Sequence, residues 1–110
     1  GKVASFIITK KMIDDSGIIP GDVDGFTDFV RSINGVEIAI MVCENESGKH
    51  RVNFRSKGKY VINAIAKSFG GGGHKFAAGA SAEGKSDIIL QNILDKTFSV
   101  IDVQNKTSMQ

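Results

Sequence analysis

The first half of the chain contains three segments whose apolar residues predict β-strands. Residues 3–9 are rich in β-branched and aromatic side chains, which is typical of a buried strand. Residues 36–44 and 49–56 place apolar side chains at alternate positions, so each segment is expected to bury one face. A polar connection that includes Gly48 joins these two segments and predicts a hairpin. We therefore expect residues 36–44 and 49–56 to pair as antiparallel strands.

Apolar residues at helical spacing predict three helices. The first is expected from a cap at Asp22 to about Arg31, the second over residues 60–69, and the third from a cap at Ser86 to about Val100. The predicted apolar faces are Val23, Phe26, Phe29 and Val30 in the first helix, Ile62, Ile65, Ala66 and Phe69 in the second, and Leu90, Ile93, Leu94, Phe98 and Ile101 in the third. Each face is wide enough to pack a helix on a sheet.

The segments between these elements are predicted from their turn-forming and small residues. Residues 10–12 are expected to continue the first strand, and residues 18–21, which include the only proline, to form a loop. Residues 33–35 contain an Asn-Gly pair that accepts positive φ and ends the first helix. Residues 76–82 are mostly small, and we favour a strand there that begins by Ala78.

Together these elements predict a small α/β domain with a mixed β-sheet and packed helices. Residues 1–103 are expected to form this single domain, and the polar residues 104–110 a frayed tail. No apolar run approaches the roughly 20 residues that span a bilayer, so no membrane association is expected. The single cysteine, Cys43, excludes an internal disulfide and favours a reducing, cytoplasmic compartment.

Charge and residue chemistry indicate a protein that binds an anion and does not itself cleave it. The net charge of +2 is compatible with an anionic ligand, but it is far below that of a domain built to bind duplex nucleic acid. The two histidines and the scattered acidic residues do not form a metal-ligand cluster, and no Ser/His/Asp arrangement stands out. Cys43 lacks a histidine partner and is interpreted as structural.

Four consecutive glycines, residues 70–73, lie between two segments that are expected to pack in the core. A flexible linker is one interpretation and a helix C-cap another, although a cap accounts for Gly70 alone. Glycine costs roughly 0.5–1 kcal/mol relative to alanine in a regular element, so three further glycines cost on the order of 2 kcal/mol unless the backbone requires them. Close approach of main-chain N–H groups to an oxyanion, above all a phosphate, is such a requirement. The run matches neither the Walker loop nor GxGxxG.

Three side chains are candidates to act with the glycines. His74 follows them directly and is able to donate to a phosphate oxygen, although a backbone carbonyl is an alternative partner. Arg55 offers a planar fork of donors and Ser56 a hydroxyl, whereas the alternative for Arg55 is a solvated surface position. A helix that returns antiparallel to its strand would bring these two near the glycines. His50, beside the hairpin, is expected to be exposed.

Four short motifs in this region resemble one known family. They are RSKG at residues 55–58, INAIA at residues 62–66, FGGGGH at residues 69–74 and AAGA at residues 77–80. At this spacing they resemble the C-terminal substrate-binding domain, the DHH-associated domain, of DHH-family phosphoesterases. Within that family the chain is similar to bacterial oligoribonuclease and pAp-phosphatase proteins, the nanoRNases, which are also called exopolyphosphatase-related.

This resemblance implies one half of a two-domain, metal-dependent phosphoesterase. An N-terminal domain, absent here, would hold two Mn²⁺ ions and the catalytic residues, so this fragment would carry no metal ligand or catalytic residue and would be inactive alone. Short single-stranded RNA or a nucleotide phosphate would be the substrate. By position, Gly71, Gly72, Gly73 and His74 would meet its phosphate, and Arg55 and Ser56 would grip that phosphate or the terminal nucleotide. A homodimer is left open.

Several alternatives remain within and beyond the family. The parent protein is expected to be a nanoRNase-like enzyme, or alternatively a RecJ-like exonuclease, a cyclic dinucleotide phosphodiesterase or an exopolyphosphatase. A non-catalytic RNA- or nucleotide-binding module is a rival from another class, because related glycine-rich domains occur in alanyl-tRNA synthetase-like proteins. A plain dimerisation domain is the third.

Overall fold

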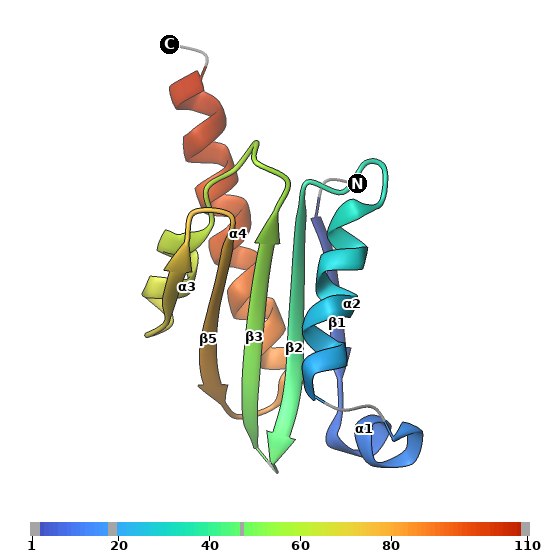
Figure 1. Cartoon of the computed structure of the whole chain (residues 1–110). Helices are drawn as coiled ribbons and strands as arrows, with labels where there is room; N and C mark the ends of the chain where they lie inside the picture. The colour runs from blue at the N-terminus through green and yellow to red at the C-terminus, as the bar shows by residue number, and fades with distance from the viewer. Residues whose placement is uncertain (1–2, 18–19, 47, 109–110) are drawn as a thin grey trace.

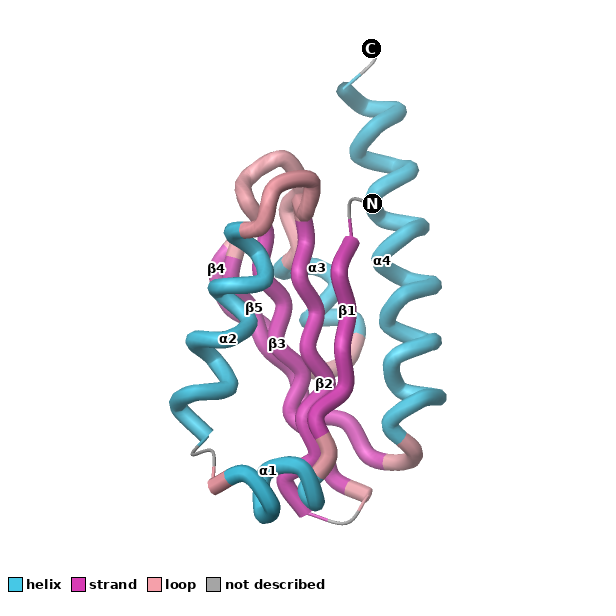
Figure 2. The backbone as a smooth tube through the Cα atoms, turned by 90° about the vertical axis from the view of Figure 1, so that its right-hand side faces the viewer, coloured by secondary structure: helices cyan, strands magenta, loops and turns pink. Residues whose placement is uncertain are grey.

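A computed structural model of the chain describes residues 3–17, 20–46 and 48–108 and shows one mixed sheet between helices (Figures 1 and 2). In chain order the elements are β1 (Val3–Ile8), α1 (Lys10–Ser16), α2 (Pro20–Ser32), β2 (Ile38–Glu46), β3 (Lys49–Ser56), α3 (Asn63–Ser68), β4 (Gly72–His74), β5 (Ala77–Glu83) and α4 (Ser86–Ser108). The predicted α/β class with a mixed sheet is confirmed.

The order of strands across the sheet is β1-β2-β3-β5-β4. β1 and β2 are parallel, and the other neighbouring pairs are antiparallel. The predicted hairpin is confirmed as β2 and β3, although Ser47 in its connection lies outside the described residues. β5 is the strand expected near Ala78, but the short edge strand β4, which includes two of the four glycines, was not expected.

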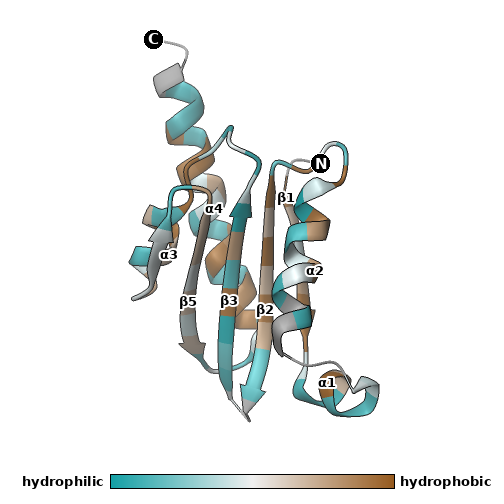
Figure 3. Ribbon diagram, viewed as in Figure 1, coloured by the Kyte–Doolittle hydropathy of each residue, from teal (hydrophilic) through white to brown (hydrophobic). Residues whose placement is uncertain are grey.

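Helices cover the two faces of the sheet unequally. α3 and α4 lie on one face, where they bury the main core together with alternate residues of β2 and β3, including Ile40, Val52 and Phe54. α1 and α2 lie on the other face, next to a smaller cluster that contains Met41 and Cys43. β2 is therefore buried on both faces. On β3 the face toward α3 and α4 is buried, whereas on the opposite face Asn53 is buried and Arg51 is exposed; in Figure 3, β2 is brown over most of its length and β3 largely teal.

Two expectations for the first quarter of the chain were wrong. Residues 10–12 do not extend β1, because the Thr9 hydroxyl accepts a hydrogen bond from the Met12 N–H and caps α1 instead. α2 begins at Pro20, where a fixed φ and a missing N–H suit the first helical position. Of the expected loop, residues 18–19 lie outside the described residues.

The apolar face expected for α2 was also partly wrong. Phe26 and Phe29 are 47% and 62% exposed, whereas Thr27 and Val30 are buried against the sheet. Phe26 packs edge-on against Phe6 of β1, with ring centroids 5.1 Å apart. The side chain of Val23 lies outside those described.

His50 is buried, not exposed as its position beside the hairpin suggested. It is 2% exposed, and its Nε2 lies 2.6 Å from the hydroxyl of Ser86 at the start of α4. The cause is strand alternation, because His50 shares the inward face of β3 with Val52 and Phe54. The start of α4 then covers the end of that face.

α4 continues beyond its expected end and is held to the domain by polar contacts. It runs to Ser108, so residues 104–108 are helical rather than frayed, and residues 109–110 lie outside the described part. The Gln104 carboxamide accepts from the Val61 N–H at 3.0 Å and donates to the Val61 carbonyl at 2.8 Å. The Tyr60 hydroxyl donates to Asn105 at 3.1 Å. Among the described residues, none of the helices combines the length and apolar character needed to span a membrane.

Candidate functional site

The candidate site lies on the sheet face that carries α2, over β3, β5 and β4. α2 contacts β2 and β3 and leaves β5 and β4 uncovered on this face (Figure 1). The strand register sets three cross-strand rows of residues that share this face. The rows are Arg55, Ala77 and His74; Asn53, Gly79 and Gly72; and Arg51 with Ser81. Basic side chains of β3 thus stand beside small residues of β5 and β4.

Arg55, His74 and two of the glycines line one cavity of about 300 Å³, called here the Arg55 cavity. Its remaining lining comes from Arg51, Asn53, Ala77, Ala78 and Gly79. The structure therefore brings Arg55 close to Gly72, Gly73 and His74, although helix α3 separates them along the chain. Gly71 lines a neighbouring cavity instead.

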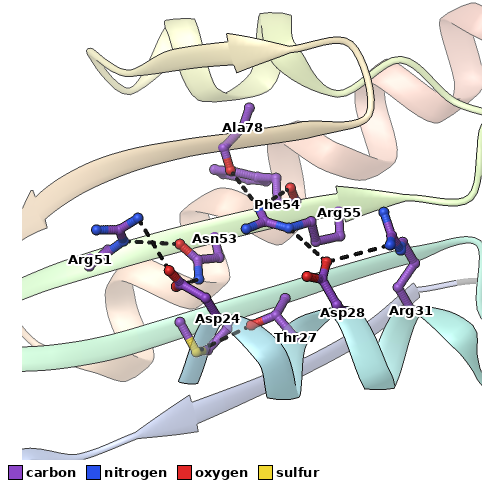
Figure 4. A network of polar contacts seen from close by, with 10 residues as sticks. Asp24, Thr27, Asp28, Arg31, Arg51, Asn53, Phe54, Arg55 and Ala78 are labelled. Atoms are coloured by element: carbon purple, nitrogen blue, oxygen red, sulfur yellow. Dashed lines mark hydrogen bonds and ion pairs between the residues drawn. The ribbon is translucent and has the colours of Figure 1, made fainter. Parts of the chain in front are cut away.

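The guanidinium of Arg55 is held in place on three sides (Figure 4). Its Nε donates to Asp28 Oδ1 of α2 at 3.0 Å, and its Nη1 donates to the carbonyls of Phe54 at 3.0 Å and Ala78 at 3.4 Å. The side chain is only 15% exposed. Within the described residues no hydrogen bond or ion pair uses Nη2, so one end of a fixed guanidinium remains to bind an anion.

A second carboxylate of α2, that of Asp24, contacts Asn53 and Arg51 of β3. Asp24 Oδ1 accepts from the Asn53 amide at 2.6 Å, and Asn53 Oδ1 accepts from Arg51 Nε at 3.2 Å (Figure 4). Arg51 Nη2 also lies 3.8 Å from Asp24 Oδ2. Asn53 is 1% exposed, so this network is fixed by burial.

These acidic partners were not identified from the sequence as site residues. The available signal was their spacing, because Asp24 and Asp28 are four residues apart on one helical face. Asp28 also pairs with Arg31 at 3.5 Å. Which strand that face would meet depended on the tertiary arrangement.

Three of the four glycines are required by the fold itself. Gly70 has φ +82° and ends α3. A Cβ on Gly71 would lie 2.0 Å from the Gly79 carbonyl oxygen, and a Cβ on Gly73, whose φ is +142°, would lie 2.7 Å from the Ala78 Cα. The linker interpretation is therefore wrong, and the cap interpretation holds for Gly70.

Gly72 differs from the other three. It has no positive φ, and a Cβ built on it meets nothing within 4 Å. It lines the Arg55 cavity and faces Gly79 across β4 and β5. The fold does not explain this glycine, whereas close approach of a ligand to the main chain would.

His74 and Ser56 have different surroundings. His74 is exposed at the rim of the Arg55 cavity on the edge strand. Ser56 is buried, and its hydroxyl donates to the Tyr60 carbonyl at 2.6 Å and accepts from the Gly58 N–H at 3.2 Å. Its own N–H donates to the Phe76 carbonyl at 2.9 Å, which holds the turn between β4 and β5. A direct contact between Ser56 and phosphate stays a prediction.

The described residues do not fit the metal centre that the family resemblance implies for the whole enzyme. They contain no group of three His, Cys, Asp or Glu side chains able to hold a metal ion.

Burial, and next the nearby Asp24 carboxylate, raise the pKa of the Cys43 thiol. A buried thiol of raised pKa is a structural side chain, not a reactive one.

Comparison with known proteins identifies relatives of the predicted kind. The chain is 36% identical over 78 residues to the bifunctional oligoribonuclease and PAP phosphatase NrnA of Bacillus subtilis, covering 71% of this chain and 24% of that protein. It is 33% identical over 78 residues to the protein of the same name from Thermus thermophilus, with the same coverage. The chain thus spans about a quarter of the length of these relatives.

Solved structures agree with the fold. An exopolyphosphatase-related protein from Bacteroides fragilis superposes with a TM-score of 0.73 at 28% identity, over 86% of this chain and 28% of that one. The C-Ala domain of Aquifex aeolicus alanyl-tRNA synthetase gives a TM-score of 0.59 at 12% identity, over 84% of this chain and 89% of that one. The second likeness concerns the fold alone. The family model of the DHHA1 domain matches residues 3–101, and the chain therefore belongs to this DHH-associated family, as its glycine motif predicted.

Proposed function

We propose that this domain is the substrate-binding part of a metal-dependent phosphoesterase and binds the phosphate of a short oligoribonucleotide or of pAp. The observation that carries the proposal is the Arg55 cavity, in which a fixed guanidinium, an exposed imidazole and a bare glycine main chain meet. The names of the two NrnA relatives, oligoribonuclease and PAP phosphatase, support this ligand class.

The cavity offers a phosphate three kinds of contact. Arg55 Nη2 would donate a charge-assisted hydrogen bond, worth about 1.5–3 kcal/mol. His74 would add a ring N–H from the edge strand β4, with β5 between it and the strand of Arg55. Gly72 would let a phosphate oxygen approach the main chain without a methyl group in the way. The Arg55 guanidinium is already held by three hydrogen bonds, so its side chain loses little conformational entropy when the ligand binds.

In this proposal the domain binds and orients the substrate, and the chemistry takes place on a separate N-terminal catalytic domain of the same cytoplasmic protein. The two Mn²⁺ ions implied by the resemblance would be held there, because the described residues of this chain offer no set of three ligands. Such ions supply an activated water and neutralise developing charge. Arg55 and His74 would fix the position of the substrate phosphate relative to that centre.

Titration of the ¹⁵N-labelled chain with pAp and with a diribonucleotide tests the proposal. We expect saturable NMR shifts at the amides of Gly72, Gly73 and His74 and at Arg55 Nε, because these groups line one cavity. The amide of Lys96, on the exposed side of α4, is an internal reference. Shifts confined to α4, or the absence of saturable shifts with both ligands, would refute the site.

A further inference from the structure

A second, larger cavity adjoins the Arg55 cavity. It measures about 530 Å³ and is called here the Ser81 cavity. Its side-chain lining includes Asn45, Arg51 and Ser81, and its remaining walls are Ala80 and the glycines 70–72 and 79. Arg51, Gly72 and Gly79 line both cavities, so one ligand is able to occupy both.

The second cavity has a different chemistry from the first. Among the described residues that line it, Arg51 alone is charged, and the Arg51 guanidinium already lies 3.8 Å from the Asp24 carboxylate. Asn45 and Ser81 each offer both a donor and an acceptor, and within the described residues neither side chain has a hydrogen-bond partner. A phosphate has only acceptors to offer, whereas a nucleobase and a ribose present donors and acceptors together.

The walls of the Ser81 cavity also suit a flat group. The glycines expose bare peptide planes, because no side chain projects from them into the cavity. Arg51 lies where the two cavities meet, and its side chain is 58% exposed. A guanidinium in that place is able to stack on a nucleobase.

We propose that the Ser81 cavity binds the nucleoside whose phosphate occupies the Arg55 cavity. The inference rests on the proposed function and extends it, because it makes the domain selective for nucleotides over inorganic phosphates. Ser81 and Asn45 contact the base or ribose, and Arg51 stacks on the base at the boundary. The strand register supports a ligand that extends from the Arg55 cavity toward Ser81, since Arg51 and Ser81 form the row that follows Asn53 and Gly79 along the sheet.

The test compares three probes on the 110-residue chain: AMP, ribose 5-phosphate and inorganic pyrophosphate. Base stacking is expected to make AMP bind about tenfold more tightly than ribose 5-phosphate. Ser81→Phe fills the cavity from an exposed strand position, where an aromatic residue is well tolerated. It should reduce the AMP to ribose 5-phosphate ratio to about one and leave pyrophosphate affinity unchanged. Glu83→Phe, which adds the same ring to β5 outside both cavities, is the matched control.

The possible outcomes distinguish a failure of the nucleoside assignment from a failure of the proposed phosphate binding. A ratio near one in the unsubstituted chain, or a ratio that survives Ser81→Phe, overturns the nucleoside assignment while phosphate binding stands. If Ser81→Phe weakens pyrophosphate instead, the cavity takes a second phosphate and the assignment is wrong. If none of the probes shifts the amides of Gly72 and His74, the proposed function itself fails.

Discussion

Replacing Gly71 or Gly72 by alanine separates a glycine that the fold needs from one that a ligand needs. A Cβ on Gly71 would lie 2.0 Å from the Gly79 carbonyl oxygen and 2.7 Å from the Ala80 Cα. Both atoms belong to the backbone of β5, so no side-chain rotation relieves the overlap. β4 would have to move away from β5 or lose its pairing.

The two substitutions should therefore change stability in opposite directions. Overpacking usually costs about 1–3 kcal/mol, and Gly71→Ala should reach the upper end because its obstacle is backbone. Gly72→Ala meets nothing within 4 Å at an ordinary φ, so the loss of glycine's unfolded-state entropy should stabilise the chain by about 0.5 kcal/mol.

Urea unfolding followed by circular dichroism measures the stability of each variant, and pyrophosphate titration by NMR measures anion binding. Gly72→Ala should fold normally and bind pyrophosphate about tenfold more weakly, because its methyl group removes one charge-assisted contact. The reasoning is refuted if Gly71→Ala is as stable as the unsubstituted chain. It is equally refuted if Gly72→Ala binds pyrophosphate normally.

Three further predictions use other parts of the structure. Arg55→Lys keeps the charge but loses the planar donor fork, so pyrophosphate affinity should fall about tenfold by NMR titration; Arg31→Lys, which alters the other arginine paired with Asp28, is the control and should change nothing. The purified 110-residue chain with Mn²⁺ should show no release of mononucleotide from a diribonucleotide in a chromatographic assay, and robust turnover would reveal a metal site that the described residues lack. The raised pKa of Cys43 means that the folded chain keeps a proton that the unfolded chain loses, so stability should fall as the pH rises through the thiol's ordinary pKa. Cys43→Ala should lack that part of the pH dependence in urea titrations, and an identical dependence in both proteins would contradict the assignment.

Alternation along β2 and β3 was readable from the sequence because it is a local property. Once β3 is a strand, Val52 and Phe54 must share one face and Arg51, Asn53 and Arg55 the other. The hairpin between the two strands then followed from their connection. The glycine motif was equally local, and its likeness to a known family was confirmed over residues 3–101.

Elements stabilised by partners distant in the sequence were missed. β4 exists because β5 pairs with it, and nothing in a run of glycines favours a strand on its own. The burial of His50 depends on the start of α4, 36 residues later. The helical end of α4 depends on Gln104 reaching Val61, and such polar contacts leave no periodic signal in the sequence.

The residue types of the candidate site were determined by the sequence, but their roles were decided by the tertiary structure. Four adjacent glycines looked alike until β5 was placed against them, and only then did Gly71 and Gly73 become packing requirements and Gly72 an open position. Arg55 likewise needed Asp28 of α2 to hold its guanidinium. Close contact between strands and ion pairing between elements depend on distances across the fold, and local sequence patterns contain no information about those distances.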